Sequence, residues 1–450
     1  MSVHEGDNKQ KNDNGYMPYP RYKSSGIEWL GKVPEHWEIK KSKYQFSEID
    51  EKGFEDEELL SATQHKGVVP RDTLENRVWN PAISSLENYK LVKAGDFVIS
   101  LRTFEGGIEF SEYRGLLSPA YTVLRAKNQI PVNFVRYYFK SDPYIVGLNT
   151  ITTGIRQGKS ISYSDFCELP LLLPEKHEAE SISKFLDQET TRIDQLIEKQ
   201  ERLIELLKEK RTALISHAVT KGLDPDVEMK DSGFDWLGVI PVHWKQEKLK
   251  YLADIEYSNV DKHKNKDETE VKLCNYTDVY YEDRITNDLD FMKATADQRE
   301  INKYNLLEGD VVITKDSETP DDIAVPAIVS EHLDNVICGY HLGIIRSKPD
   351  VIFSNYLFRS FQSKNIGKQM EIKAKGITRY GLGLSDLKNS IFCNPPLKEQ
   401  ELISDYIDHE THKIDQLVKK IHMNKEKLQE YRTSLIFAAV TGKIDVRDQV

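Results

Sequence analysis

Apolar residues recur three and four positions apart along two long stretches, 179–219 and 400–440, which contain no Pro or Gly. This is the spacing of the a and d positions of a heptad, and it predicts two long amphipathic helices. The predicted a/d track of the first helix is Ile193, Leu196, Gln200, Leu203, Leu207, Lys210, Leu214 and His217. That of the second is Ile414, Leu417, Ile421, Asn424, Leu428, Tyr431, Leu435 and Ala438. One helix cannot bury such a stripe alone, so the two are predicted to pack on each other.

Three members of these tracks, Gln200, Lys210 and Asn424, are polar. The favoured interpretation is that they lie exposed near the seam between the helices. The alternative is that Asn424 is buried and fixes the register of the pair.

Outside these stretches the pattern is mixed. Short runs rich in β-branched residues predict strands at 96–101, 121–124 and 310–314. Helices are predicted at 132–139 and 354–361, and Gly- and Pro-rich loops separate the elements. The fold class expected is therefore mixed α/β.

The chain is also repeated internally, which indicates two similar halves. Residues 25–37 recur at 232–244 with 8 of 13 positions identical, and residues 178–222 recur at 399–443 with 22 of 45 identical. The offset grows from 207 to 221, so the second middle segment is longer by about 14 residues. The predicted order is a disordered tail (1–19), a globular domain (20–173), a long helix (174–222), a linker (223–231), a second globular domain (232–395), a second long helix (396–443) and a tail (444–450).

Composition narrows the class of protein. The chain has 450 residues, 39% of them hydrophobic, which is enough for two to four domains with buried cores. No apolar run approaches the ~20 residues of a membrane span, and the first 20 residues lack an apolar signal core. Four scattered cysteines form no CxxC pair. We therefore expect a soluble, cytoplasmic protein without membrane contact.

Two segments come close to catalytic motifs. Asn394-Pro-Pro-Leu397 resembles the Asn-Pro-Pro-aromatic motif of amino-methyltransferases but lacks the aromatic residue. The favoured interpretation is that its prolines form a stop that leads into the second long helix. Gly154–Ser160 has three residues between its glycines where a phosphate loop has four, and the second copy at 376–383 has no Lys. Neither predicts catalysis or nucleotide binding.

Other polar residues have structural interpretations that we favour. His409 and His412 stand three apart on the second helix without a third ligand, which is typical of a solvated face and not of a metal site. Asp96 and Asp310 follow a Gly at a strand start, which favours a turn role over a nuclease carboxylate.

The repeated His-Trp pairs also have a structural interpretation. His36 precedes Trp37, and in the second copy His243 precedes Trp244. Together with Trp29 and Trp236, these pairs are predicted to staple a helix base or domain edge. No catalytic or metal-ligating residue is therefore expected.

The net charge of −11 argues against a nucleic-acid partner, but its distribution does not. Residues 114–173 hold seven basic against three acidic residues, and 340–395 hold nine against three. Each basic half includes a Gly-flanked loop, and Arg and Gln can pair with guanine and adenine edges. The alternative is a solvated basic surface. The candidate DNA-binding residues are Thr153, Arg156, Gln157, Lys159, Lys375, Thr378, Arg379 and Tyr380.

The layout resembles the DNA-specificity subunit of type I restriction-modification enzymes. The residues that carry the resemblance are 26–37 with their copy at 233–244, Leu169–Leu196, Lys210–Ile215, Pro396–Gln400 and Tyr431–Ile436. The resemblance covers nearly all of the chain after residue 16.

The resemblance implies a non-catalytic subunit in which two target-recognition domains each read half of an asymmetric, bipartite sequence in double-stranded DNA. It implies that the long helices form an antiparallel coiled coil that docks two methyltransferase subunits. S-adenosylmethionine, ATP and Mg would then belong to partner subunits, with restriction or translocase subunits as optional members, and this chain would carry no cofactor. Two other classes remain open at this point: a self-contained site-specific methyltransferase or nuclease, and a coiled-coil scaffold without DNA contact.

Overall fold

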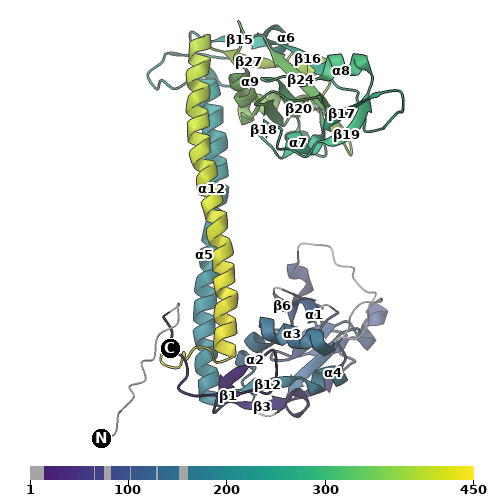
Figure 1. Cartoon of the computed structure of the whole chain (residues 1–450), viewed down its shortest axis with the longest axis vertical. Coiled ribbons are helices and arrows are strands. Elements are labelled where there is room, and N and C mark those ends of the chain that lie inside the picture. The colour runs from purple at the N-terminus through teal and green to yellow at the C-terminus, as the bar shows by residue number, and fades with distance from the viewer. Residues whose placement is uncertain are drawn as a thin grey trace. The chain divides into compact units, whose positions relative to one another are not determined.

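The computed structural model describes residues 15–64, 66–74, 83–101, 103–127, 130–151 and 161–449 (Figure 1). The chain divides into two compact units. Unit 1 comprises residues 1–200 and 423–450, and unit 2 comprises residues 201–422. Each unit combines a mixed α/β globular part with portions of two long helices, which confirms the predicted fold class.

The elements of unit 1 precede the first long helix. They are β1 (Tyr22–Ser24), β2 (Lys32–Pro34), β3 (Glu38–Lys41), β4 (Phe46–Ile49), β5 (Leu60–Thr63), β6 (Gly67–Pro70), β7 (Lys90–Val92), β8 (Phe97–Ile99), α1 (Thr103–Gly106), β9 (Glu109–Phe110), β10 (Gly115–Leu117), β11 (Thr122–Ala126), α2 (Val132–Phe139), α3 (Asp142–Ile151), α4 (Tyr163–Glu168) and β12 (Pro170–Leu173).

The elements of unit 2 lie between the long helices. They are β13 (Met229–Asp231), β14 (Val239–Pro241), β15 (Lys245–Lys248), α6 (Leu249–Leu252), β16 (Ala253–Tyr257), β17 (Thr269–Cys274), α7 (Tyr276–Tyr280), β18 (Arg284–Ile285), β19 (Met292–Ala296), α8 (Gln298–Tyr304), β20 (Val311–Thr314), β21 (Asp316–Ser317), β22 (Pro326–Val329), β23 (Val336–Cys338), β24 (Leu342–Ser347), α9 (Ser354–Phe361), α10 (Lys364–Lys373), β25 (Lys375–Gly376), β26 (Tyr380–Gly381), α11 (Leu384–Lys388) and β27 (Ile391–Asn394).

The two units share a sheet core. Strands β4-β11-β8 of unit 1 and β16-β24-β20 of unit 2 pair antiparallel in the same order. In each unit a further antiparallel pair, β3 with β12 and β15 with β27, stands just before the long helix. The predicted strands at 96–101, 121–124 and 310–314 are confirmed as β8, β11 and β20, and the predicted helices at 132–139 and 354–361 as α2 and α9.

The units differ in what is added to this core. Unit 2 carries two three-stranded sheets, β19-β17-β23 and β21-β26-β25. Unit 1 carries the pairs β5-β6 and β7-β10 in the part of the chain that the structure describes. The shared strands therefore follow the repeat, and the additions follow the sequence that does not repeat.

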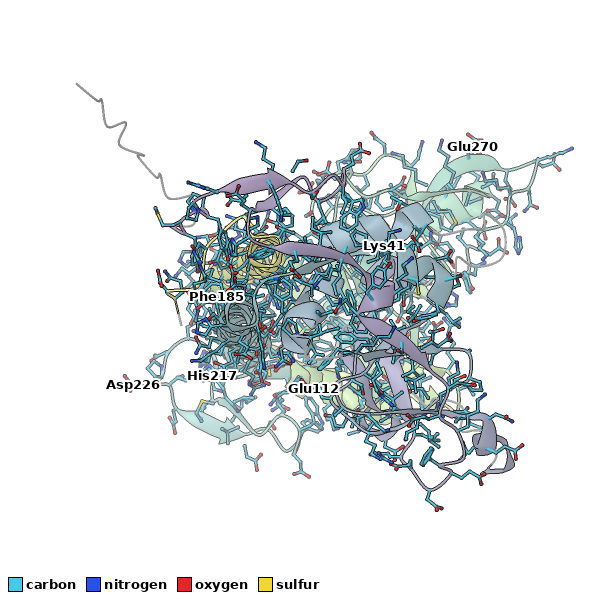
Figure 2. The ribbon with its side chains drawn as sticks, turned by 90° about the horizontal axis from the view of Figure 1, so that it is seen from below. Lys41, Glu112, Phe185, His217, Asp226 and Glu270 are labelled. Carbon is cyan, nitrogen blue, oxygen red and sulfur yellow. The ribbon has the colours of Figure 1, made fainter. Side chains whose placement is uncertain are left out.

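Aromatic rings form much of the core of unit 1. Phe46 and Phe97 meet edge-on with centroids 5.6 Å apart, and Phe139 packs against both at 5.6 Å and 5.1 Å. The long helix joins the same core through Phe185, which is buried (Figure 2). The ring of Phe185 meets that of Tyr16 edge-on at 5.6 Å. Burial of these rings fixes the globular part of unit 1 to its helix.

The two long helices are α5 (Lys176–Lys221), with 46 residues, and α12 (Leu397–Val440), with 44. In unit 1 the guanidinium Nε of Arg432 donates to Asp194 Oδ1 at 2.9 Å. In unit 2 Arg211 Nε lies 3.4 Å from Asp415 Oδ1. Because later residues of α5 meet earlier residues of α12, the helices pack antiparallel within each unit, as expected.

The predicted a/d tracks are wrong at every second position of α5. The buried and half-buried positions of α5 include Ile193, Ile197, Gln200, Ile204, Leu207, Arg211, Leu214 and Ala218, whereas the predicted members Leu196, Leu203, Lys210 and His217 are exposed. On α12, Leu417 and Asn424 are likewise exposed. Apolar residues occupy both candidate positions, as in Leu196-Ile197 and Leu203-Ile204, so the spacing alone does not choose between them.

The exposure of the three polar members of the predicted tracks tests the two interpretations. Asn424 and Lys210 are exposed, which confirms the favoured interpretation for both and excludes a register role for Asn424. Gln200 differs, since it is half-buried. The ion pairs of Asp194 with Arg432 and of Arg211 with Asp415 match charges across the pair in the register that the structure has.

The cysteines give a direct test of this packing. Cys274, Cys338 and Cys393 are buried and Cys167 is half-buried. Burial raises the pKa of the Cys393 thiol to about 12, and because only the thiolate reacts, its reactive fraction at pH 8 falls by about 1000-fold. Titration of the native chain with a thiol reagent should label one residue, Cys167, with the other three reacting only in denaturant. Rapid labelling of Cys274 or Cys338 would contradict the fold of unit 2.

Candidate nucleic-acid interface

A glutamate in the first turn of each long helix binds the repeated His-Trp pair. In unit 1, Trp37 Nε1 donates to Glu178 Oε1 at 3.0 Å, and His36 Nε2 lies 2.7 Å from Oε2. In unit 2, Trp244 Nε1 donates to Glu399 Oε1 at 2.9 Å, with His243 Nε2 at 2.8 Å from Oε2. The predicted staple is confirmed.

Trp29 and Trp236, the other tryptophans of the repeated segments, pack against the cores of units 1 and 2. The repeated segment therefore attaches each globular part to the base of its helix.

Asp96 and Asp310 also have the same role in both units. Asp96 accepts from Lys93 N at 2.8 Å and from both Nε and Nη2 of Arg125, at 2.8 Å and 2.7 Å. The copy is formed by Asp310 and Arg346, at 2.8 Å and 2.7 Å. Both carboxylates are buried, so the favoured turn role is confirmed.

A second carboxylate on each helix holds the globular part from the side. Tyr137 of α2 donates to Asp187 Oδ1 at 2.6 Å, and Arg136 donates to the same oxygen. In unit 2, Arg359 of α9 donates through Nε and Nη2 to Asp408 Oδ1, at 2.9 Å and 2.6 Å. Asp187 and Asp408 occupy equivalent positions of the repeat. The globular parts are thus fixed to their helices by ion pairs as well as by apolar packing.

Several basic residues of the two basic halves form ion pairs in the part of the chain that the structure describes. In residues 114–173 the ion pairs are Arg114–Glu57, Arg125–Asp96, Arg136–Asp187 and Lys140–Glu109. In residues 340–395 they include Arg346–Asp310, Arg359–Asp408, Lys368–Glu371 and Arg379–Asp316. A local charge count therefore overstates the free positive charge, because it omits partners that are distant in sequence.

The four candidate residues of unit 2 lie together on one hairpin. Lys375 is on β25, Tyr380 on β26, and Thr378 and Arg379 lie in the turn between the strands. Lys375 and Arg379 have side chains 85% and 55% exposed. Thr378 is exposed and Tyr380 is half-buried. The hairpin projects from the sheet β21-β26-β25, and it is not a phosphate loop.

The four candidates of the first half, Thr153, Arg156, Gln157 and Lys159, lie outside the described residues.

Two residues that the sequence did not single out surround Arg379. Arg379 Nε donates to Asp316 Oδ1 at 3.0 Å, and Nη2 donates to the same oxygen. His341 Nδ1 lies 2.8 Å from the other oxygen, Oδ2. Asp316 precedes Arg379 by 63 residues and becomes a neighbour of the hairpin only through the pairing of β21 with β26, so no local motif could have indicated it.

Tyrosines gather on nearby elements of unit 2. The rings of Tyr276 and Tyr280 on α7 are stacked at 5.3 Å, and Tyr281 is largely exposed. Tyr280 donates to Asp322 Oδ2 at 2.6 Å, which raises the pKa of this phenol to about 12. Aromatic and basic side chains together are typical of surfaces that bind nucleic acid.

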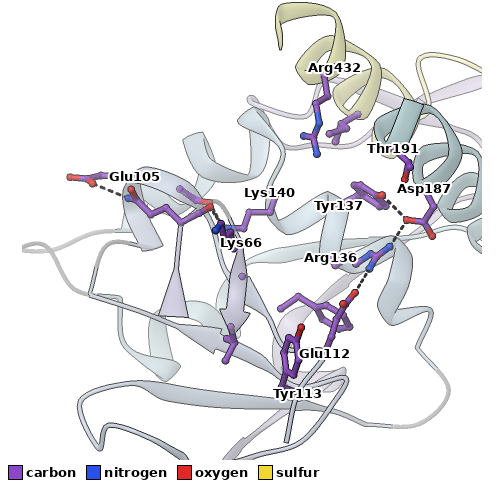
Figure 3. A pocket seen from close by; sticks show the side chains of 16 residues that line it. Lys66, Glu105, Glu112, Tyr113, Arg136, Tyr137, Lys140, Asp187, Thr191 and Arg432 are labelled. Atoms are coloured by element: carbon purple, nitrogen blue, oxygen red, sulfur yellow. Dashed lines mark hydrogen bonds and ion pairs between the residues drawn. The ribbon is translucent and has the colours of Figure 1, made fainter. Parts of the chain in front are cut away.

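Unit 1 has a cavity of about 690 Å³ between its globular part and its helices (Figure 3). Arg136 and Asp187 form part of its wall, where Arg136 also donates to Glu112 Oε1 at 3.1 Å. Lys140 is paired with Glu109, and burial lowers the pKa of this lysine. Arg432 lines the cavity from α12, and Lys66 lines it as an exposed side chain. The cavity wall therefore contains Arg136 and Lys140, whose charges are paired with neighbouring carboxylates, and Lys66, which is exposed to solvent.

The remaining motifs have structural roles. Asn394 Oδ1 accepts from Gln400 Nε2 at 2.9 Å, so Asn394 contacts the first turn of α12. His409, on α12, is exposed. The described residues contain no cluster of His, Cys, Asp and Glu that could hold a metal ion. None of the helices in those residues is long and apolar enough to span a membrane.

Comparison with known proteins finds similarity to one family. Residues 241–430 match the type I restriction modification DNA specificity domain. The type I restriction enzyme MjaVIII specificity subunit of Methanocaldococcus jannaschii is 23% identical over 362 residues, which cover 80% of this chain and 81% of that protein.

Two solved structures share the fold. A chain solved in work on complex assembly and conformational transition of the type I R-M system has a TM-score of 0.68 at 13% identity, covering 92% of this chain and 99% of that chain. The HsdS subunit from Thermoanaerobacter tengcongensis has a TM-score of 0.52 at 14% identity, covering 92% and 98%. With its repeated halves and helix pair, the chain is similar to the DNA specificity subunits of type I restriction-modification systems.

Proposed function

We propose that this specificity subunit reads an asymmetric, bipartite target in double-stranded DNA, with one half-site for each globular domain. The domains are residues 20–173 and 232–395, joined by spacer helices at 174–222 and 396–443 and by the linker 223–231, with tails at 1–19 and 444–450. The observation that carries the proposal is that identical clamps, centred on Glu178 and Glu399, hold globular parts whose added sheets differ. Two domains that are attached in the same way but carry different added sheets are suited to recognising two different DNA sequences.

In domain 2 we assign DNA contact to Lys375, Thr378, Arg379 and Tyr380 on the β25–β26 hairpin. A two-stranded ribbon fits the major groove of B-DNA. In domain 1 the corresponding assignment is Thr153, Arg156, Gln157 and Lys159, on the basis of sequence. The cavity of unit 1 adds Lys66 as a candidate for phosphate contact, because this lysine combines positive charge with solvent access.

This proposal is tested by the methylation pattern of the reconstituted complex. Sequencing of methylated adenines across a genome should yield a motif whose two halves differ and are separated by unspecified bases. The reason is that the two domains share a frame but little of the surface built on it. A palindromic motif would contradict the assignment of one half-site to each domain.

We further propose that two methyltransferase subunits dock on the long helices and carry S-adenosylmethionine, and that restriction or translocase subunits with ATP and Mg join the same cytoplasmic complex. The helices carry large apolar side chains that the seam does not use. Leu196 is 38% exposed, Leu203 45% and Leu417 48%. Exposed large apolar side chains on a helix pair are typical of a partner surface.

Replacing Leu203 and Leu417 with aspartate should weaken binding of a methyltransferase subunit by at least about 10-fold, since burying one leucine contributes ~1.5–3 kcal/mol. Isothermal titration would measure the loss, and far-UV circular dichroism should show unchanged helicity because neither side chain lies in the seam. Leu307→Asp is the matched control, because Leu307 is 44% exposed but lies off the helices. Equal binding by all variants would place the docking surface elsewhere.

A further inference from the structure

The pair formed by Arg379 and Asp316 differs from the other Arg-Asp pairs in where it lies. Arg125–Asp96 and Arg346–Asp310 recur in both units with the same distances, so they belong to the shared frame. Arg379 instead sits in the exposed turn of a hairpin that belongs to one of the additions in unit 2. In the aligned repeat, the position of Asp316 is occupied by Arg102 in the first half, which has the opposite charge. A feature of one copy alone suits discrimination of one half-site.

The carboxylate of Asp316 is held from both sides. One oxygen accepts from Arg379, and the other lies 2.8 Å from His341 Nδ1. The His341 ring is itself packed on Tyr340, with centroids 3.7 Å apart. Asp316 is largely buried, with 17% of its side chain exposed against 55% for Arg379. The arginine is thus presented to solvent by a fixed carboxylate.

The hairpin backbone is fixed as well. β26 pairs with β21 on one side and with β25 on the other. A Cβ atom added at Gly376 would come within 1.9 Å of the carbonyl oxygen of Arg379, so only glycine allows this approach of the two strands. Few degrees of freedom remain to be lost when the arginine meets a ligand, which favours specific contact.

The charge of the pair favours a base over a phosphate. Asp316 already neutralises the guanidinium, and its carboxylate would repel a phosphate brought close to it. The acceptors O6 and N7 of guanine are uncharged, and a guanidinium fork reaches both at once. Asp316 accepts from Nε and Nη2, and Nη2 also lies 3.0 Å from His341 Nδ1, while Nη1 has no hydrogen-bond partner among the described residues. The two N–H groups of Nη1 are therefore available to the acceptors of a guanine.

We propose that Asp316 and His341 are positioning residues that hold Arg379 to read one guanine in the half-site of residues 232–395. This rests on the proposed function, since it requires that domain 2 reads a half-site. Discrimination by one such two-pronged contact corresponds to about 5- to 150-fold between guanine and other bases.

The first test maps methylated adenines produced by the complete complex with Arg379→Lys, Asp316→Asn or His341→Ala. Lysine keeps the positive charge beside Asp316 but lacks the fork. Each variant should lose preference at the same single guanine, most strongly for Arg379→Lys, and keep every other base of both half-sites. The control is Arg299→Gln, an exposed arginine on α8, which should leave the motif unchanged.

The outcomes separate the possibilities. Unchanged guanine preference in Arg379→Lys overturns the inference, and so does an equal loss of methylation at all sites, which would indicate a purely structural role for the pair. If the wild-type complex itself yields no bipartite motif, the proposed function fails instead.

The second test uses binding to duplexes in which that guanine is replaced by 7-deazaguanine, which lacks the N7 acceptor. The wild-type complex should bind the altered duplex at least about 5-fold more weakly, while Arg379→Lys should show no further loss. An equal loss in both proteins would mean that another residue reads N7.

Discussion

Replacing Glu178 with alanine is expected to lower the free energy of unfolding of unit 1 by about 2–4 kcal/mol. The substitution removes the acceptor of the indole N–H of Trp37, and this ring is completely buried. A buried donor left without a partner costs its full desolvation, and hydrogen bonds to a charged acceptor are the stronger kind. Glu178 also stands in the first turn of α5, where a negative charge is favoured by the helix dipole.

The second copy supplies the matched comparison. Glu399 makes the same two contacts, but 29% of its side chain is exposed against 6% for Glu178. Water can replace part of what Glu399→Ala removes, so the loss there should be roughly half as large. Urea unfolding followed by circular dichroism, with hydrogen exchange to separate residues 30–41 from residues 237–248, would measure both. Glu178→Gln keeps an acceptor and should cost about 1 kcal/mol. Equal and small losses in the two copies would show that the clamp does not hold the domain.

The repeated parts of the molecule could be predicted from the sequence, because the constraints that form them are local or duplicated. The helices follow from uninterrupted apolar spacing, and the His-Trp staple follows from its recurrence. What the repeat did not reveal is the partner, since Glu178 lies 141 residues from Trp37 and is joined to it only in the fold.

The seam and the charge distribution could not be predicted for a different reason. At 196–197 and 203–204 either residue is hydrophobic enough to fill the seam, and in the structure Ile197 and Ile204 are the more buried members. The basic halves contain pairs such as Lys140–Glu109 and Arg359–Asp408 whose members meet through tertiary contacts. The sequence indicated the hairpin of Lys375 to Tyr380 as a candidate site. It did not indicate Asp316 and His341, because only the fold brings these residues close to Arg379.

Deleting one heptad from each long helix should shorten the unspecified spacer of the DNA target and leave both half-sites unchanged. Suitable segments are residues 197–203 of α5 and 423–429 of α12. Both helices run without a break from one unit to the other, and a seven-residue deletion preserves the a/d seam. At 1.5 Å per residue each helix loses about 10 Å, which corresponds to about three base pairs of 3.4 Å.

A spacer shorter by about three base pairs also turns one half-site relative to the other by about 100°, because B-DNA completes a turn in about 10.5 base pairs. The helix pair keeps its facing after a heptad deletion, so DNA twisting and bending must absorb that turn. Methylation by the variant complex should therefore be slower than by the wild type, with the new motif still found by mapping methylated adenines. Deleting 197–203 alone should abolish assembly, since one helix would lose its register with the other. An unchanged spacer in the double deletion would show that the helices do not set the distance between the two reading sites.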